Sequence, residues 1–385
     1  MTSHDAHTIH PDHRAADPVR ITRHVDVVAA ATNPEAFSSA VSRFLNVPNT
    51  MDGEEHAKYR AIVDRYLTSE VVRGLEPMFC EVAAQVSADL LPDGAFDVVR
   101  DYGFRFAVRA QCRWLGWPLE LEDELLDWMD ANHRASRSGD AEALAEVAQR
   151  FTDIVSAQVA VRAEMREADP DRAPQDVTEE LFLEQVDGRE LTIDEIVSIL
   201  RNWTAGDLSS LALCTAVVLR SLAVSPCLQR RVRYLVRHGA HLKQGRLQGE
   251  LDAIVDECIR IEDPFVSNRR ITTCPVTLPS GQVLPAGHRV VLDWAEANRD
   301  PEVFGNPDDF RPDENRPHNL VYGIGPHVCP GRELSTSELR IAVGELLAAT
   351  TWLEIEPGHT PVPQEPPLAG YAEVRLTVTL EPKPE

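Results

Sequence analysis

The longest unbroken helical pattern in this chain begins at Thr192, and it limits the folds that the chain can adopt. Thr192 and Glu195 have the spacing of a capping box, in which the side chain of each residue bonds the backbone N–H of the other. Only Gly206 interrupts the pattern before Pro226, so we expect a helix of roughly 33 residues, about 50 Å long. Globular helices seldom run so far. The sequence therefore predicts a mainly helical protein built around one very long central helix.

Amphipathic helices and a few late strands account for most of the remaining sequence. Apolar residues recur at helical spacing in the segments 55–67, 70–90, 104–115, 121–129, 141–167 and 227–261. Strand-like patterns are expected at 19–28 and, late in the chain, at 270–278, 282–284, 289–293 and 375–380. Strands collected near one end argue against alternating β–α units. We expect one mainly α domain with a small β region, residues 19–385, behind a flexible N-terminal tail, residues 1–18.

Composition and charge exclude several classes of protein. The net charge is −24, whereas a surface that binds nucleic acid needs an excess of lysine and arginine. Seven cysteines without paired spacing indicate a reducing compartment and not a disulfide framework. No signal segment is visible, and the longest apolar run, 211–219, is about half of a bilayer span. We expect a cytoplasmic protein that binds neither nucleic acid nor a membrane. The histidines of the tail are interpreted as part of a flexible segment and not as a metal site: His4, His7, His10 and His13.

One cysteine stands in an unusual setting. Cys329 follows a glycine-punctuated stretch that begins at Tyr322, and it precedes a helix expected over 332–350. Glycine allows backbone conformations with positive φ and lets a flat ligand approach the main chain. A cysteine at a helix N-terminus is favoured as the thiolate, the form that binds metal and serves as an axial ligand of haem iron. Taken alone, the residues also fit an ordinary glycine-rich turn with a buried free cysteine.

The segment 322–331 resembles the haem-binding loop of cytochromes P450, Phe-Gly-x-Gly-x-His-x-Cys-x-Gly. Only the first fixed position differs, where Tyr322 replaces phenylalanine. The resemblance implies that haem b is bound in this loop, with the Cys329 thiolate on the iron and with Gly323 and Gly331 beside the cofactor. Further segments match the same family in the same order, so the resemblance extends over about 19–380.

A second matching segment is Glu-x-x-Arg, here Glu257 and Arg260. Residues three apart on a helix share one face, and the resemblance implies a buried ion-pair network on the thiolate side of the haem. The family usually completes this network with an arginine four residues after a phenylalanine that matches Phe310. That position is Glu314 in this chain, so Arg316 is the candidate replacement.

Several cationic residues resemble those that bind haem propionates. His56 and Arg60 fit His-x-x-x-Arg, and two donors four residues apart on a helix can grip a carboxylate. A surface cationic pair is the alternative interpretation. Arg270 resembles the propionate-binding arginine of the family, although the adjacent Arg269 leaves the register open. His327 occupies a loop position that also contacts a propionate. Such groups would offset the desolvation of two negative charges.

The long helix carries a variant of the family's oxygen-binding pattern, Ala/Gly-Gly-x-Asp/Glu-Thr. Gly206 leaves room for oxygen, and Ser209 replaces the threonine hydroxyl. The acid position is Leu208, and the carboxylate of Asp207 stands one residue earlier. One residue is about 100° of rotation around a helix, so Asp207 cannot occupy the same place. A solvated or salt-bridged surface acid is the alternative interpretation of Asp207.

Pro330 is another departure from the family pattern. Proline has no N–H, so one hydrogen bond to the thiolate is expected to be missing, which would lower the potential of the iron. Proline also suits the first turn of the following helix. Together with Leu208, this departure makes peroxide use an alternative, because peroxide brings its own protons and electrons. Against it, no arginine stands beside the core of the long helix.

The resemblance implies a soluble, bacterial-type haem-thiolate monooxygenase that inserts one oxygen atom from O2 into a small or medium organic substrate. Electrons would come from a ferredoxin or flavodoxin with its reductase, since no flavin or iron–sulfur segment is seen. Only sixteen residues separate Ser39 from His56, which predicts an open pocket for a bulky or carrier-tethered substrate. Four residues are expected to face that substrate: Asn202, Ala205, Phe265 and Val266.

Two other functions remain open from the sequence. One is atypical chemistry of the same family, such as peroxide-driven oxidation, oxidative coupling or rearrangement. The other is a haem-binding protein without turnover. The identity of the substrate and the position of its oxidation are not encoded in any recognisable pattern.

Overall fold

The computed structural model describes residues 18–42, 44–242 and 245–380. The expected tail, including its four histidines, lies outside these residues apart from Pro18. The described part begins with β1 (Val19–Ile21) and α1 (His24–Ala31). The strand expected over 19–28 is therefore wrong beyond Ile21. The alanine-rich segment turns into a helix that buries Val27, Ala30 and Ala31 on one side.

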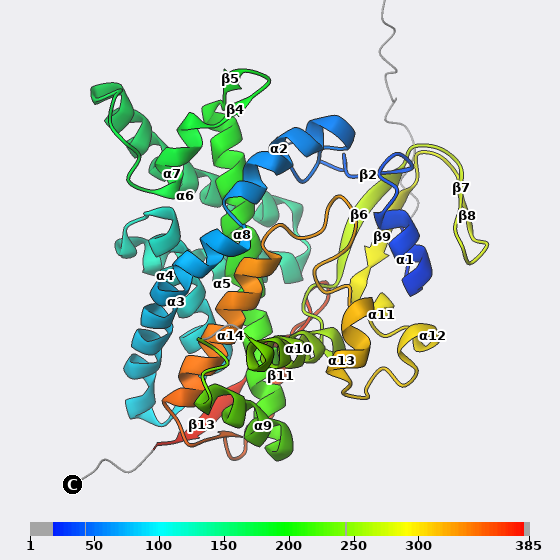
Figure 1. Cartoon of the computed structure of the whole chain (residues 1–385). Coiled ribbons are helices and arrows are strands. Elements are labelled where there is room, and N and C mark those ends of the chain that lie inside the picture. Colours follow the sequence, from blue (N-terminus) through cyan, green and yellow to red (C-terminus); the bar gives the residue numbers. More distant parts are fainter. Residues whose placement is uncertain (1–17, 43, 243–244, 381–385) are drawn as a thin grey trace, which may run out of the picture.

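Helices form most of the molecule (Figure 1). The longer ones are α2 (Gly53–Arg65), α3 (Ser69–Leu90), α4 (Arg105–Leu115), α5 (Glu122–Ser138), α6 (Ala141–Ala168), α9 (Pro226–Arg237), α10 (Arg246–Ile261) and α14 (Arg332–Ala348). A π-helical segment, Val98–Phe104, leads into α4. The short ones are α7 (Val177–Glu180), α11 (Trp294–Ala297), α12 (Pro301–Phe304) and α13 (Pro312–Asn315).

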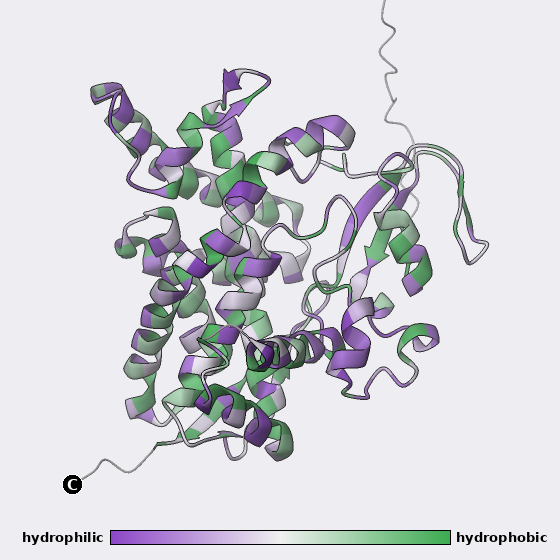
Figure 2. Ribbon diagram, viewed as in Figure 1, coloured by the Kyte–Doolittle hydropathy of each residue, from purple (hydrophilic) through white to green (hydrophobic). Residues whose placement is uncertain are grey.

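The helix expected over 227–261 is two helices, α9 and α10. Gly239 has a φ of 79° and Gly245 a φ of 143°, conformations that a right-handed helix does not contain. The sequence offers no proline between the two helices, and the pattern of apolar residues alone did not reveal the break. Figure 2 shows the alternation of hydrophilic and hydrophobic segments along α3 that marks an amphipathic helix.

The predicted central helix is confirmed as α8 (Ile193–Val224). Its capping box is complete: the Thr192 N–H donates to Glu195 Oε2 at 2.8 Å, and the Glu195 N–H donates to Thr192 Oγ1 at 3.3 Å. Helices α4, α6, α10 and α14 pack around it. By length and composition α8 could cross a membrane, but most of its apolar window is buried inside the protein, as in the core helix of a globular fold.

The β region is small and combines strands from both ends of the chain. A four-stranded sheet has the order β1-β9-β6-β2, with β1 parallel to β9, and a three-stranded sheet has the order β10-β13-β3. The strands not yet placed are β2 (Phe37–Ser38), β3 (Ala95–Asp97), β6 (Ser267–Thr272), β9 (Arg289–Asp293), β10 (Trp352–Ile355) and β13 (Arg375–Thr379). Hairpins are formed by β4 (Gln185–Val186) with β5 (Arg189–Glu190), β7 (Val276–Thr277) with β8 (Val283–Leu284), and β11 (Val362–Pro363) with β12 (Tyr371–Glu373).

Two apolar clusters form the core. The larger one joins α8 to the surrounding helices, and the smaller one joins β1, β2, β8 and β9 to α1 and Trp294. The segment 320–329 runs between them: Leu320 and Ile324 pack on the small cluster, whereas Val321 packs on the large one. This position places the candidate loop at the junction of the two clusters.

Candidate functional site

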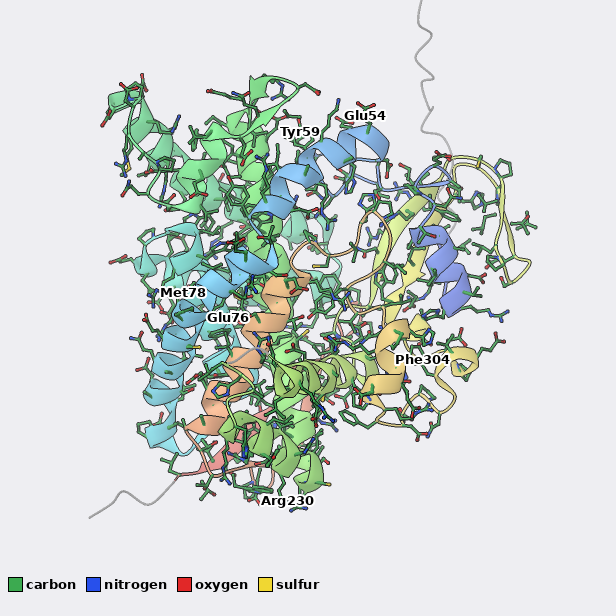
Figure 3. The ribbon with its side chains drawn as sticks, viewed as in Figure 1. Glu54, Tyr59, Glu76, Met78, Arg230 and Phe304 are labelled. Carbon is green, nitrogen blue, oxygen red and sulfur yellow. The ribbon has the colours of Figure 1, made fainter. Side chains whose placement is uncertain are left out.

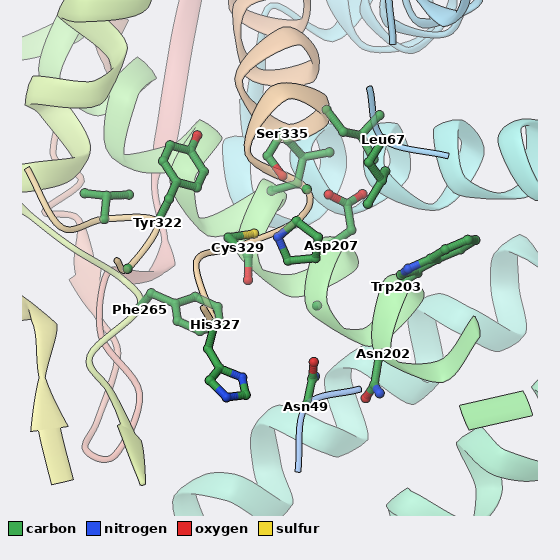
Figure 4. Close-up of a pocket in the computed structure, with 18 of the residues that line it drawn as sticks. Asn49, Leu67, Asn202, Trp203, Asp207, Phe265, Tyr322, His327, Cys329 and Ser335 are labelled. Carbon is green, nitrogen blue, oxygen red and sulfur yellow. The ribbon is translucent and has the colours of Figure 1, made fainter. Parts of the chain in front are cut away.

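A cavity of about 300 Å³ lies at this junction. Its walls come from α8, from α14, from β6 and from the loop that carries Cys329 (Figure 4). Cys329, His327, Asp207 and Trp203 all line the cavity, although they are distant in sequence. The structure thus brings together the cysteine loop and the long helix, as the sequence predicted.

The backbone fixes the position of Cys329. Its N–H donates to the carbonyl of Tyr322 at 2.8 Å, and the Val328 N–H donates to the carbonyl of Gly325 at 3.0 Å. Gly325 has a φ of 82°, and a Cβ atom there would lie only 2.6 Å from the carbonyl oxygen of Ala31. Glycine is therefore required both for the turn and for its contact with α1.

Burial and hydrogen bonding have opposite effects on the pKa of the Cys329 thiol. Burial raises the pKa of the Cys329 thiol, while the Gly331 N–H and the charges of Arg60 and Arg332 lower it. Burial is the larger effect, so the helix N-terminus alone does not make this residue a thiolate. The Gly331 N–H supplies a donor to sulfur one residue beyond Pro330, which has none. A cationic metal at the cavity would favour the ionised form.

Of the residues expected to bind propionates, Arg270 and His327 line the cavity, whereas His56 and Arg60 do not. Arg270 lines the cavity and is 8% exposed, and no carboxylate among the described residues forms an ion pair with it. Burial lowers the pKa of the Arg270 guanidinium, so an anionic ligand there would stabilise it. Arg269 is exposed, because alternate residues of β6 face opposite sides. Of the two arginines, only Arg270 lines the cavity.

His327 lines the cavity between two polar partners. Its Nε2 lies 3.1 Å from Ser39 Oγ and 3.4 Å from Asp52 Oδ1, and its ring centroid is 4.1 Å from that of His56. Burial, together with His56 and Arg270, lowers the pKa of His327 to about 4, and burial also lowers the pKa of His56. Both imidazoles are therefore neutral near pH 7 in this arrangement, and they act as hydrogen-bonding groups.

Arg60 forms hydrogen bonds to the backbone of the loop that carries Cys329. Its Nη1 donates to the carbonyls of Val328 at 2.7 Å and Pro326 at 3.2 Å, and its Nε donates to Asp64 at 2.6 Å. Neither Arg60 nor His56 is among the residues that line the cavity. The i, i+4 pair thus holds the loop and His327 in this structure.

Glu257 and Arg260 form the predicted buried pair. Arg260 donates from Nε and Nη2 to the two carboxyl oxygens of Glu257, at 2.7 and 2.9 Å, and from Nη1 to the Asn298 carbonyl at 2.8 Å. The ring of Phe304, labelled in Figure 3, lies 4.7 Å from the guanidinium carbon. The side chains of Arg260 and Glu257 are almost completely buried, so removal of either one would leave the charge of the other uncompensated.

The third residue bonded to this pair is not Arg316, the candidate from the sequence. Glu314 is exposed, and Arg316 is 3.9 Å from Asp256 and not in contact with Glu257. Instead, Asn315 donates from Nδ2 to Glu257 Oε1 at 2.7 Å, and the Arg311 N–H donates to the same oxygen at 2.9 Å. A neutral amide suffices because Arg260 already balances the charge of Glu257.

The residues of α8 that border the cavity differ in part from those that the sequence pattern predicted. Gly206, Asp207 and Ser210 line the cavity, and Ser209 does not. The Ser209 hydroxyl is buried and has no hydrogen-bond partner among the described residues. Of the four residues expected to face substrate, Asn202 and Phe265 line the cavity, whereas Ala205 packs on the large apolar cluster and Val266 is absent from the lining. The spacing Trp203, Gly206, Ser210, Cys214 is helical and was available in the sequence.

Asp207 belongs to a buried acid pair with Glu338. Gln111 Nε2 donates to Asp207 Oδ2 at 2.6 Å, and Ser335 also bonds this carboxylate. Glu338 of α14 is fully buried, and no N–H or O–H group of the described residues reaches its carboxyl oxygens. Burial and the neighbouring Asp207 raise the pKa of Glu338 well above its usual range. Glu338 therefore keeps a proton and donates it to Asp207, because two facing carboxylates cannot both ionise.

These features define a cavity lined by a cysteine sulfur and by an arginine that has no ion pair among the described residues. The family model described as Cytochrome P450 matches residues 123–379, more than half of the chain. The chain belongs to the cytochrome P450 family. Members of this family bind haem b through a cysteine thiolate, and the protein is accordingly a haem monooxygenase.

Individual relatives are distant but cover nearly the whole chain. Cyclomarin C epoxidase CymV of Salinispora arenicola is 28% identical over 95% of this chain and 92% of its own length. Erythromycin C-12 hydroxylase of Saccharopolyspora erythraea is 29% identical over 85% of this chain and 81% of its own length. A solved structure of a mutant of P450 EryK with erythromycin B has a TM-score of 0.79 and 24% identity, covering 95% of this chain and 92% of that one.

Proposed function

We propose that this protein is a cytoplasmic P450 that inserts one oxygen atom from O2 into an organic molecule of secondary metabolism. The relatives with an epoxidase or hydroxylase name support this class of reaction. The observation that carries the proposal is the sulfur of Cys329 at the wall of a cavity whose opposite wall is the glycine-containing face of α8. Electrons would come from a ferredoxin or flavodoxin with its reductase.

The residues of the cavity fit haem. Cys329 would hold the iron, and Arg270 with His327 would bond the propionates, while His56 and Arg60 would support His327 and the loop. When bound, the haem supplies the activation of O2. Gly206 leaves space on α8, and the loop glycines leave space beside Cys329. An uncompensated buried guanidinium is costly, so the anionic edge of the cofactor would be stabilised at Arg270.

The protein's own part in the reaction is to hold protons and exclude water. Asp207 borders the cavity and shares a proton with Glu338, so this pair can deliver a proton from the interior to the cavity wall. Ser210 presents its side chain to the same cavity, one residue from the hydroxyl expected at Ser209. We propose Ser210 as the hydroxyl that orients water or oxygen, with Ser209 as the alternative.

The substrate would enter beside the segment that precedes α2. Pro48 and Asn49 line the cavity, and α8 anchors this segment: Asn202 Nδ2 donates to the Val47 carbonyl at 2.6 Å. Directly before it, the side chains of Phe44 and Leu45 are exposed. Apolar groups at this edge favour a bulky apolar substrate, free or carrier-tethered. Asn202 and Phe265 are proposed as substrate contacts.

The spectrum of the reduced protein with carbon monoxide tests the assignment of Cys329. Wild-type protein should show the red-shifted band of a thiolate-bound haem, and Cys329→Ser should lose it. Cys214→Ser is the matched control, because Cys214 is a second free cysteine that lines the same cavity. A myoglobin-like band in the wild type would overturn the proposal.

Peroxide-driven or other atypical oxidation is the second candidate. The observation in its favour is that Leu208 occupies the usual acid position and that Asp207 is bonded to Gln111 and Glu338. Turnover of a substrate that shifts the spin state of the haem should be measured with a ferredoxin and its reductase, and separately with hydrogen peroxide. Support by peroxide alone would favour this candidate. Failure of both, with haem bound, would indicate a haem-binding protein without turnover.

A further inference from the structure

We propose that Trp114, Trp203 and Tyr66 form an aromatic chain that removes unused oxidising equivalents from the cavity to the protein surface. This inference rests on the proposed haem function and goes beyond it. It assigns a protective one-electron oxidation to three aromatic residues of the protein.

The chain begins at the cavity. Trp114 of α4 and Trp203 of α8 both line it, and Figure 4 shows Trp203 on the α8 wall. Their rings are stacked, with centroids 5.3 Å apart and an interplanar angle of 25°. The ring of Tyr66, directly after α2, is 5.5 Å from that of Trp203. All three side chains are buried, so the rings are in contact without intervening water.

The chain ends at the surface. The Tyr66 hydroxyl donates to Glu184 Oε1 at 3.0 Å, and Arg65, which is 60% exposed, bonds Glu184 Oε2 at 2.6 Å. Burial and Glu184 raise the pKa of the Tyr66 phenol, so it remains protonated and a hydrogen-bond donor. A proton that leaves Tyr66 therefore has an acceptor already in place.

The two indoles lack such an acceptor. Neither Trp114 Nε1 nor Trp203 Nε1 has a hydrogen-bond partner among the described residues, and both are buried. An oxidised indole with no base at Nε1 keeps its proton and remains a strongly oxidising cation. It can therefore take an electron from Tyr66, whose oxidation is eased by loss of the proton to Glu184. This difference in hydrogen bonding favours oxidation of Tyr66 by the indole cation, so the oxidising equivalent moves away from the cavity.

The electrons and protons of this transfer balance. Haem bound in the cavity would supply the oxidising equivalent through the family's reaction with O2 or peroxide, and Trp203 or Trp114 would give up one electron to it. Tyr66 returns one electron to the indole cation and transfers its phenolic proton to Glu184. A thiol-class reductant in solution then gives one hydrogen atom to the tyrosyl radical, and the proton on Glu184 leaves to water. The net result is one electron delivered to the haem from an external reductant.

Simple packing of aromatic residues is the competing explanation, and a hydroxyl deletion separates the two. Tyr66→Phe keeps the ring and its packing but removes the oxidisable O–H. Tyr59→Phe is the matched control: Tyr59 lies on α2 (Figure 3) and also donates to a carboxylate, Glu195. Among the described residues no aromatic contact joins Tyr59 to Trp203 or Trp114.

The experiment uses the haem-loaded protein with hydrogen peroxide and no substrate. Freeze-quenched samples are examined for a radical signal, assigned to tyrosine with ring-deuterated tyrosine, and the decay of the haem absorbance is followed. We expect Tyr66→Phe to lose the tyrosyl signal and to shorten the haem half-life severalfold, and Tyr59→Phe to match the wild type. Glu184→Gln should diminish the tyrosyl signal while Tyr66 is present.

Failure of the proposed function and failure of the aromatic chain give different results. A wild-type protein without the thiolate band in carbon monoxide would overturn the proposed function itself. With that band present in all variants, a Tyr66→Phe protein that keeps the wild-type radical signal and the wild-type haem half-life would overturn the aromatic chain alone.

Discussion

The loop that carries Cys329 and the wall of α8 that faces it are held by different means. Main-chain hydrogen bonds and two glycines with positive φ, Gly323 and Gly325, fix the loop. The wall of α8 consists of side chains on a regular helix, and each can change without moving the backbone. This difference explains why the departures from the family pattern on α8 alter an acid and a hydroxyl, while every glycine of the loop is kept.

The largest expected effect is a loss of stability on breaking the buried pair of Glu257 and Arg260. Among the described residues, Arg260 carries the only guanidinium bonded to Glu257, so Arg260→Met leaves a buried carboxylate with N–H donors from Asn315 and Arg311 alone. Breaking a buried ion pair costs about 3–5 kcal/mol. Chemical denaturation should show this loss of stability together with poor haem incorporation. Arg316→Met, at an exposed arginine that does not contact Glu257, is the control and should remain close to wild type.

Gly325→Ala tests the backbone of the loop itself. The positive φ costs about 1–3 kcal/mol for a residue with a Cβ, and the contact at 2.6 Å with the Ala31 carbonyl adds to it. Gly323→Ala has a similar φ, but its nearest atom would be 3.8 Å away. We expect a lower haem content and lower thermal stability for Gly325→Ala than for Gly323→Ala. Equal values for the two variants would show that the contact with α1 is unimportant.

Features fixed by local sequence were predictable, and features fixed by tertiary packing were not. The capping box at Thr192 located the start of α8, and the spacing of Glu257 and Arg260 placed both on one buried face. Asn315 escaped prediction because its role depends on where α13 meets α10. The short β3 strand escaped because three residues carry no periodic signal, and it exists only through its pairing with β13.

Which residues of α8 face the cavity also depends on tertiary packing and was therefore not predictable from the sequence. The resemblance aligned Ser209 with a threonine, yet helix packing turns Ser210 toward the cavity. Ser210→Ala should therefore lower the fraction of reducing equivalents that reach product by about a hundredfold, at the lower end of proton-transfer effects. Ser209→Ala should leave this fraction near the wild-type value, because its hydroxyl is buried away from the cavity lining. Product formed per reductant consumed is the measurement, and the reverse order of the two variants would restore the original alignment.

The acid pair of Asp207 on α8 and Glu338 on α14 gives an effect on stability that depends on pH. Because the pKa of Glu338 is raised in the folded protein, the folded state binds more protons than the unfolded state above the ordinary pKa of glutamate. Stability from this group is therefore lost as the pH rises from about 4.3 toward the raised pKa, by about 1.4 kcal/mol for each pH unit in that interval. Glu338→Gln keeps a hydrogen-bond donor for Asp207 but does not titrate. Its melting temperature should fall less than that of the wild type between about pH 5 and pH 8, as the ordinary glutamate range implies. A parallel fall in both proteins would mean that Glu338 is already ionised in the folded state, and the wall would then hold two carboxylates with Gln111 and Ser335 as their donors.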